Sequence, residues 1–217
     1  MRQQQPARIA GGLLDRYFHV CAFFNSAEEE DRVLLPFVLE GMLNREKAVH
    51  IWDPALLEAH AQSLKLTLGA AGIDVASSEC AGQLAILSTD DVYLQGGSFE
   101  VGRMLQTIEG AIAQGREQGF QRSRILGHME WALKGHPGSS QLLEFEIKVN
   151  DVLARTEQPA VCIYDVNLLS AKQMMDLLRA HPLTIVNGVL HENPFFTPAE
   201  QYLRELQPQR EGPRAIA

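Results

Sequence analysis

The chain has 217 residues, 46% of them hydrophobic and 21% charged, which is the size and composition of one globular α/β domain with a substantial core. Its formal net charge of −8 repels phosphate backbones and anionic lipid surfaces, so we expect neither nucleic acid nor a membrane as a main partner.

The two ends of the chain are polar, and we expect tails over residues 1–12 and 208–217 around a single domain over residues 13–207. The first segment lacks the apolar stretch of a signal peptide, and no apolar run reaches the length of a membrane span. Three irregularly spaced cysteines do not form a disulfide framework. We therefore expect a cytoplasmic location, where thiols stay reduced.

Six short runs within the domain are nearly continuous in apolar residues and rich in β-branched or aromatic side chains. They span residues 18–24, 48–52, 84–87, 124–129, 160–164 and 183–186. Such runs are typical of strands that are covered on both faces.

Helix-start signals separate these runs. They are Ser26 with Glu29, Asp53 with Pro54, Ser98, Ser170 with Gln173, and Thr197 with Glu200. The alternation of strands and helices predicts an α/β fold in three layers, with a mostly parallel central sheet and helices on both faces. In such sheets, ligands bind at the carboxyl ends of the strands.

The turn after the first strand, residues 24–31, is where a nucleotide-binding protein would carry its phosphate loop. That loop needs glycines, a lysine and a serine or threonine, but this turn has no glycine and no lysine. It carries instead the acidic run Glu28, Glu29, Glu30 and Asp31, at a helix end that would otherwise attract anions. The sequence therefore predicts neither ATP hydrolysis nor magnesium-dependent ATP binding.

Several reactive side chains fall near predicted strand ends. His19 and Cys21 lie two apart and so share one face of a strand. They could form a polar floor for a ligand or a weak metal site, or simply a buried histidine beside an apolar thiol. Glu130 and Trp131 follow the fourth strand, either as a ligand clamp or as an exposed acid beside a loop-anchoring tryptophan.

Three further features complete the candidates. Glu146 borders the apolar stripe of a predicted helix, where most such residues are solvated and a minority point into a pocket. Tyr164 and Asp165 end the fifth strand, and Asp165 could also cap a turn. His191 follows the last strand on a loop that Pro194 stiffens. Metal-protease and serine-hydrolase motifs are absent, whereas a cysteine nucleophile paired with a histidine stays open.

The same segments carry a resemblance to a known family. Residues 18–30, 48–54, 130–133, 162–165 and 188–195, in that order, resemble the methanogen/methylotroph, DcmR sensory (MEDS) domain, over roughly residues 15–206. The resemblance implies a divergent RecA/KaiC-like fold without a phosphate-binding loop. It also implies a role in one-component regulators and sensor kinases, where the domain is proposed to bind small organic molecules. No output module is recognisable in the 217 residues.

We therefore expect a stand-alone, non-catalytic sensory domain that binds a small organic ligand and signals to a protein partner, with no cofactor. The chain could also form a homo-oligomer. The expected ligand-binding residues are His19, Cys21, Glu130, Trp131, Glu146, Tyr164, Asp165 and His191. The alternatives are a degenerate RecA/KaiC-like nucleotide-binding protein or an enzyme that uses the same crevice, and a structural interaction module. Whether His19 and Cys21 bind a metal stays open.

Overall fold

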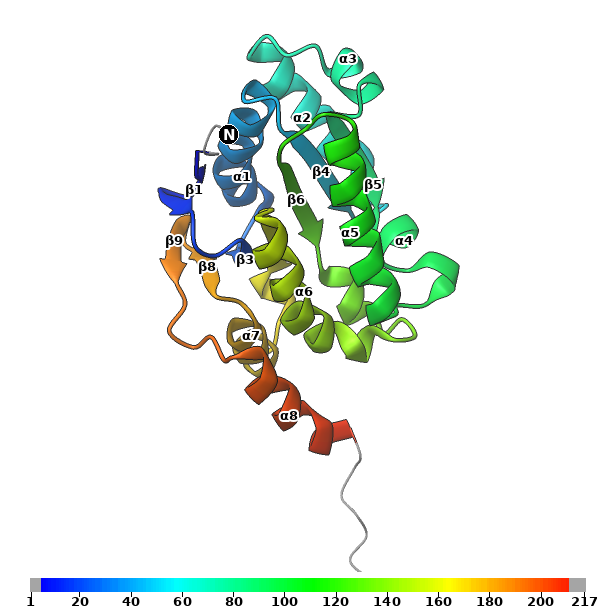
Figure 1. The fold of residues 1–217 in the computed structure, drawn as a ribbon, viewed down its shortest axis with the longest axis vertical. Coiled ribbons are helices and arrows are strands. Elements are labelled where there is room, and N and C mark those ends of the chain that lie inside the picture. Colours follow the sequence, from blue (N-terminus) through cyan, green and yellow to red (C-terminus); the bar gives the residue numbers. More distant parts are fainter. Residues whose placement is uncertain (1–4, 211–217) are drawn as a thin grey trace, which may run out of the picture.

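The structure, a computed structural model, describes residues 5–210 and has a seven-stranded sheet at its centre (Figure 1). In space the strands follow the order β5-β4-β6-β7-β3-β8-β9, and all neighbours are parallel except β9, which runs antiparallel to β8. The strands are β3 (His19–Phe24), β4 (Lys47–Trp52), β5 (Leu84–Ser88), β6 (Ser123–His128), β7 (Ala160–Asp165), β8 (Leu183–Val186) and β9 (Val189–Glu192).

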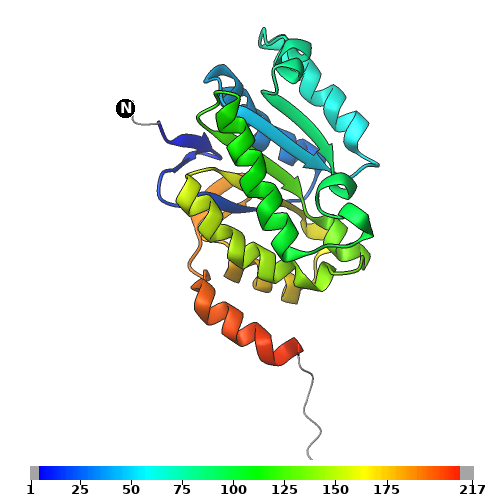
Figure 2. The same cartoon turned by 45° about the vertical axis from the view of Figure 1, so that its right-hand side comes forward.

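Helices cover both faces of the sheet (Figure 2). The α-helices are α1 (Ala27–Leu43), α2 (Leu57–Ala70), α3 (Val75–Cys80), α4 (Thr89–Val92), α5 (Val101–Glu117), α6 (Leu142–Thr156), α7 (Ala171–Ala180) and α8 (Ala199–Arg210). Short 3-10 helices are η1 (Gln95–Gly97), η2 (Glu130–Lys134), η3 (Ser139–Gln141) and η4 (Val166–Leu168). No helix within residues 5–210 is both long enough and apolar enough to cross a bilayer.

The central strands bury both faces, as their apolar runs predict. On β3, Val20 and Ala22 pack against the α1 and α2 layer, whereas Cys21 and Phe23 pack against α5 and α6. All six residues of β3, β4 and β6 are buried. The six predicted strands and the three-layer α/β arrangement are therefore confirmed.

The prediction of a flexible N-terminal tail over residues 1–12 is wrong for the part of the tail that the structure describes. Residues 7–14 form a hairpin of β1 (Ala7–Ile9) and β2 (Gly12–Leu14), and Ala7, Ile9 and Leu14 are buried. The hairpin lies beside β9, where the Leu190 N–H donates to the Ala10 carbonyl at 3.0 Å (Figure 1). Residues 1–4 lie outside the described residues.

The predicted C-terminal tail also begins too early, because α8 continues through residue 210. Tyr202 of α8 is buried in a small cluster with Ile147 of α6 and Ala180 of α7. This packing on α6 and α7 supports the last helix of the chain. The rest of the predicted tail, residues 211–217, lies outside the described residues.

Of the five predicted helix starts, two are correct and two are displaced, and the helix expected from Thr197 is α8, which begins at Ala199. Ser26 caps α1, where the Glu29 N–H donates to its hydroxyl at 3.3 Å, and Ser170 forms a complete capping box with Gln173. The helix expected after Asp53 begins only at Leu57, because the Asp53 carboxylate accepts from the Ala55 N–H and closes a turn first. The helix expected from Ser98 begins at Val101.

A buried arginine holds α1 against the sheet. Arg124 of β6 is 1% exposed, and its guanidinium donates to the Glu46 carboxylate at 2.5 Å, the Glu40 carboxylate at 3.0 Å and the Phe37 carbonyl. A buried charge is tolerated only with such partners. Gly41 gives the arginine its space, because a Cβ at this position would lie 2.6 Å from Arg124 Nε.

Candidate functional site

A cleft of about 460 Å³ opens at the carboxyl ends of β3, β4, β6 and β7, the edge where ligands bind in open parallel sheets. The first turns of α1 and part of α2 form its other side. The lining residues are Phe24, Ser26, Ala27, Glu30, Asp31, Trp52, Asp53, Leu56, Ala59, His60, Ser63, His128, Glu130, Lys134, Asp165 and Leu168.

Two of the eight predicted ligand-binding residues line this cleft. Glu130 begins η2 two residues after the last residue of β6, and Asp165 ends β7. The Asp165 N–H donates to the Glu130 carboxylate at 3.1 Å, and the Asp165 carboxylate in turn accepts from the Asn167 N–H at 2.8 Å. The two acids therefore fix the loops that follow neighbouring strands, and their contact with a ligand stays a prediction.

His128 lies in the cleft between two carboxylates. Its Nε2 is 2.9 Å from Glu30 and its Nδ1 is 3.2 Å from Glu130. Burial lowers the pKa of His128, but the hydrogen bonds to Glu130 and Glu30 outweigh burial and raise this pKa to about 9. The imidazole is therefore protonated at neutral pH and joins α1 to the end of β6.

An aromatic surface forms another part of the cleft. The Trp52 ring stacks on His60, with centroids 3.6 Å apart and planes 12° from parallel, and its centroid lies 4.4 Å from that of His128. Burial, together with the charge of His128, lowers the pKa of His60 to about 4. Two histidines that touch the same indole therefore carry different charges at neutral pH.

The charge balance of the cleft is negative. Five carboxylates line it, and the cationic side chains among its lining are His128 and Lys134, the latter paired with Asp53. Much of the remaining lining is apolar, including the half-exposed Leu56 and Leu168. Such a lining suits a small neutral or cationic molecule with an apolar part, and it disfavours a polyanion.

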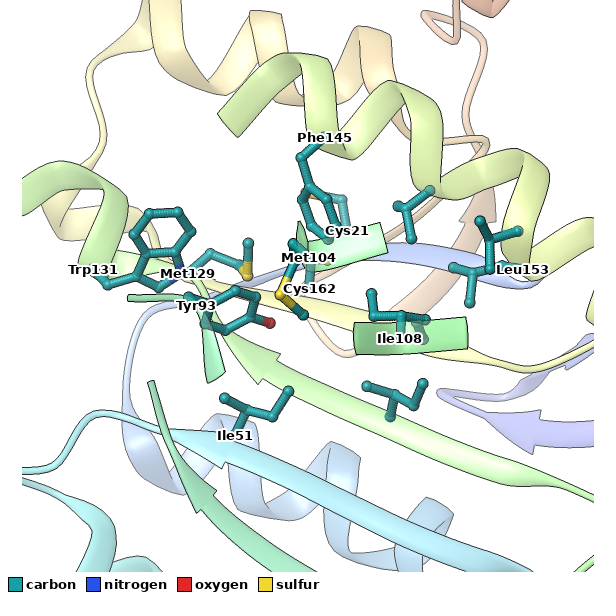
Figure 3. Packing of buried hydrophobic residues seen from close by; sticks show 14 of the residues in the cluster. Cys21, Ile51, Tyr93, Met104, Ile108, Met129, Trp131, Phe145, Leu153 and Cys162 are labelled. Atoms are coloured by element: carbon teal, nitrogen blue, oxygen red, sulfur yellow. The ribbon is translucent and has the colours of Figure 1, made fainter. Parts of the chain in front are cut away.

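Trp131 is not in the cleft. The indole is 2% exposed and lies in the core beside Tyr93 (Figure 3). Its ring centroid is 5.1 Å from that of Tyr93 and 4.6 Å from that of Phe99. The 3-10 helix η2 sends Glu130 and Trp131 in different directions, so they do not form the predicted clamp. Trp131 therefore anchors the loop after β6, which is the second of the two interpretations of the sequence.

His191 is also separated from Glu130, so the prediction that both line one pocket is wrong. The chain reverses at Asn187 and Gly188, which have φ values of +51° and +74°, and His191 then runs back along the sheet edge opposite Thr184. It is exposed and does not line the cleft. The turn after β8 carries this residue away from the carboxyl ends of the strands.

The remaining four predicted residues, His19, Cys21, Glu146 and Tyr164, lie in the core on the α6 side of the sheet. There Cys21 neighbours Cys162 across β3 and β7, and both thiols lie in the core layer of Figure 3. The Glu146 carboxylate accepts from the Tyr164 hydroxyl at 2.5 Å and lies 3.3 Å from Nε2 of His19. These residues form a second group of polar side chains and do not contact the cleft.

His181 completes this buried group, and sequence reasoning missed it. Its Nε2 lies 3.3 Å from the Glu146 carboxylate. Burial raises the pKa of Glu146, but His181 and His19 outweigh burial and hold this pKa below its ordinary value. Burial and the charge of Glu146 raise the pKa of the Cys162 thiol well above its usual range.

The predicted ligand-binding residues leave out most of the cleft lining, including the aromatic and basic side chains Trp52, His60, His128 and Lys134. Trp52 ends β4 and His128 ends β6, so the rule that ligands bind at carboxyl ends could have found them. His60 lies in α2 and Lys134 ends the 3-10 helix η2. Neither position carries such a signal, because both side chains reach the cleft only through tertiary packing.

Comparison with known proteins assigns the chain to a family. Residues 18–182 match the profile of the MEDS family, the MEthanogen/methylotroph, DcmR Sensory domain. The transcriptional repressor DcmR of Methylorubrum extorquens (strain DSM 6343 / CIP 106787 / DM4) is 28% identical over 183 residues, which cover 83% of this chain. The match spans 64% of that relative's length, less than two thirds.

A solved structure supports the fold. The KaiC-like protein PH0186 from the hyperthermophilic archaeon Pyrococcus horikoshii OT3 superposes with a TM-score of 0.52 at 15% sequence identity, covering 81% of this chain and 73% of that one. The mostly parallel sheet with helices on both faces is therefore a RecA-like arrangement. Since the family profile covers more than half of the sequence, the chain belongs to the MEDS family of sensory domains.

Proposed function

We propose that the chain is a non-catalytic sensory domain that binds a small organic molecule in the cleft at the carboxyl ends of β3, β4, β6 and β7. The observation that carries this proposal is the lining itself, in which an indole and aliphatic side chains lie next to carboxylates and a protonated histidine. Ligand pockets combine apolar walls with a few polar groups in this way. Family membership and the repressor relative support a regulatory role.

The cleft favours a ligand with one apolar part and few negative charges. The half-exposed Leu56 and Leu168 offer apolar contact, while Glu130 and Asp165 accept hydrogen bonds from a hydroxyl or an ammonium group. A triphosphate would meet Glu30 at the end of α1 where a phosphate loop would place backbone N–H groups. We therefore propose that nucleotides are not the ligand.

Signal output would begin at the contact between Glu130 and Asp165. A ligand that competes for the Glu130 carboxylate alters the hydrogen bond to the Asp165 N–H and so the start of η4. A ligand acts on a conformational equilibrium only through such differential contacts. We propose that a protein partner in the cytoplasm reads the resulting change in the loops after β6 and β7.

Native mass spectrometry on freshly purified protein tests whether a small molecule is carried in the cleft. Charge preference is tested with three probes that share a ring, namely benzyl alcohol, benzylamine and benzoate, by saturation-transfer NMR. We expect the neutral and cationic probes to bind more tightly than benzoate. Benzoate binding as tight as that of benzylamine would contradict the proposed ligand class.

A matched set of variants locates the binding. Glu130→Gln removes a cleft carboxylate, and it should weaken benzylamine binding about ten- to a hundredfold, the cost of a lost charged hydrogen bond. Glu28→Gln and His191→Ala change exposed residues outside the cleft and should leave binding unchanged. Calorimetry with ATP and magnesium completes the set. Micromolar ATP binding that Glu30→Gln alters would replace the proposal with the nucleotide-binding alternative.

A further inference from the structure

Four side chains that bind metals in other proteins converge in the core on the α6 side of the sheet. His19 begins β3, Glu146 lies in α6, Cys162 lies in β7 and His181 follows α7. Their exposures lie between 0% and 7%. One donor atom from each residue lies within 4.8 Å of the donor atoms of the other three.

Four of the six separations between these donor atoms have the lengths of tetrahedron edges, and the other two are at most 4.8 Å. Oε2 of Glu146 is 3.3 Å from His19 Nε2, 3.3 Å from His181 Nε2 and 3.4 Å from Cys162 Sγ, while Sγ is 3.3 Å from His19 Nε2. A tetrahedral zinc ion, with bonds of about 2.0–2.3 Å, holds its ligand atoms about 3.3–3.6 Å apart. Four of the separations therefore match a common central ion.

The hydrogen bonding of the two ring nitrogens of His181 also indicates a metal ligand. Its Nδ1 lies 2.8 Å from the Leu177 carbonyl oxygen, so Nδ1 carries the proton. In the neutral ring, Nε2 then has only a lone pair, and it faces the acceptor Oε2 of Glu146. Among the described residues this fully buried nitrogen has no hydrogen-bond partner of acceptable geometry.

The hydrogen bond to His19 likewise leaves its Nε2 free to bind a metal. The Asn150 amide nitrogen donates to the backbone carbonyls of Glu146 and Ala180, both at 2.9 Å, which turns the Asn150 oxygen toward Nδ1 of His19 at 3.2 Å. His19 Nε2 therefore also presents a lone pair. A metal-bound histidine commonly donates its second N–H to a carbonyl group, as both histidines do here.

While both imidazole rings are neutral, this group of side chains has more acceptor atoms than protons to share among them. Two imidazole lone pairs and Oε2 of Glu146 converge, and the S–H of Cys162 supplies one proton. Tyr164 already donates to the other oxygen of Glu146 at 2.5 Å, which leaves Oε2 for a further partner. A cation would accept all of these lone pairs at once.

We propose that His19, Glu146, Cys162 and His181 bind one divalent transition-metal ion, for which Zn²⁺ matches the donors best. Binding converts the Cys162 thiol to a thiolate and releases its proton to solvent. The thiolate and the carboxylate then balance the 2+ charge in an interior that does not tolerate net charge. Four protein ligands make a closed, structural site that joins β3, α6, β7 and the end of α7. This site is independent of the cleft and its ligand.

Metal content is measured first, by mass spectrometry of the elements in protein purified without a chelator and without a metal-affinity tag. We expect about one zinc per chain in the wild type, as four ligands to one ion require. Cys162→Ala should lose the metal. Cys21→Ala removes the neighbouring thiol, equally buried and paired with Cys162 across the strands, and should keep it.

The absorption spectrum of the Co²⁺-substituted protein then identifies the ligands. Protein refolded with Co²⁺ should show the visible bands of a tetrahedral site and a thiolate-to-Co²⁺ charge-transfer band, which Cys162→Ala lacks and Cys21→Ala retains. Asn150→Ala removes the hydrogen bond to His19 and should lower metal affinity about 10- to 100-fold. Circular dichroism verifies that each variant is folded.

Two results would overturn the proposal. The first is wild-type protein that contains no metal as isolated and acquires neither Zn²⁺ nor Co²⁺ on refolding. His181 would then be an imidazolium paired with Glu146. The second is equal loss of metal in Cys21→Ala and Cys162→Ala, which would place the ion elsewhere.

Discussion

Nε2 of His128 lies 2.9 Å from a carboxylate oxygen of Glu30, so a charged hydrogen bond joins the first turn of α1 to the carboxyl end of β6. Both side chains line the cleft. The acidic run in the first turn of α1 therefore has a structural role, because it supplies the anion that holds a protonated imidazole in place.

Removing the Glu30 charge should lower the pKa of His128. In Glu30→Gln the imidazole keeps Glu130 but loses one of its two carboxylates, and we expect its pKa to fall by about 1–2 units. Histidine NMR titration measures the change. Glu28→Gln, an exposed acid in the same turn, is the control, and an equal fall in that variant would contradict the assignment.

His128 should make stability depend on pH between about 6.5 and 9. Its pKa is higher in the folded protein than in the unfolded chain, so its contribution is complete below pH 6.5 and is lost as pH rises toward 9. The free energy of unfolding should fall across this window by up to about 3 kcal/mol. Denaturant titrations of wild type and His128→Gln at both pH values measure the difference, and parallel curves would contradict it.

The three cysteines should react with thiol reagents at very different rates. Cys21 and Cys162 are buried, whereas Cys80 is exposed at the end of α3. Mass spectrometry of folded protein during labelling should show Cys80 modified first. Faster modification of Cys21 would support a reactive-thiol site instead.

The buried ion pairs of Glu46 with Arg122 and Arg124 should contribute more to stability than an ion pair on the surface. Glu46→Ala leaves the guanidinium groups of Arg122 and Arg124 short of a carboxylate, and we expect a loss of about 3 kcal/mol in the free energy of unfolding. Glu109→Ala breaks an exposed pair with Arg155 and should cost less than about 1 kcal/mol. Similar losses in both variants would contradict the argument.

The sequence predicts the sheet well because burial on both faces leaves a continuous apolar signal, as in β3 and β6. The hairpin of β1 and β2 has strands of three residues, too short for an alternation to stand out. Strand β9 had a usable signal, because Asn187 and Gly188 form the dipeptide typical of a tight hairpin turn. A hairpin at this dipeptide places His191 on an antiparallel strand, away from the carboxyl ends of the parallel strands.

The candidate site is predictable only for residues at or just after the end of a strand. Asp165 ends β7 and Glu130 lies two residues after the end of β6, and both line the cleft. Glu146 borders an apolar helix stripe, and its sequence position does not reveal that α6 presses it onto β3 and β7. His181 is brought to His19 across 162 positions of chain by the register of the sheet, and no local pattern carries that information.

Whether position 41 can change depends on which residue occupies position 124. A side chain on Gly41 would enter the space of a guanidinium that Glu46, Glu40 and the Phe37 carbonyl hold in place. A lineage can therefore gain alanine at position 41 only together with a shorter residue at position 124, and that exchange would leave Glu46 buried without one of its arginines. These positions should consequently vary as a set among relatives, with the acid lost alongside the arginine.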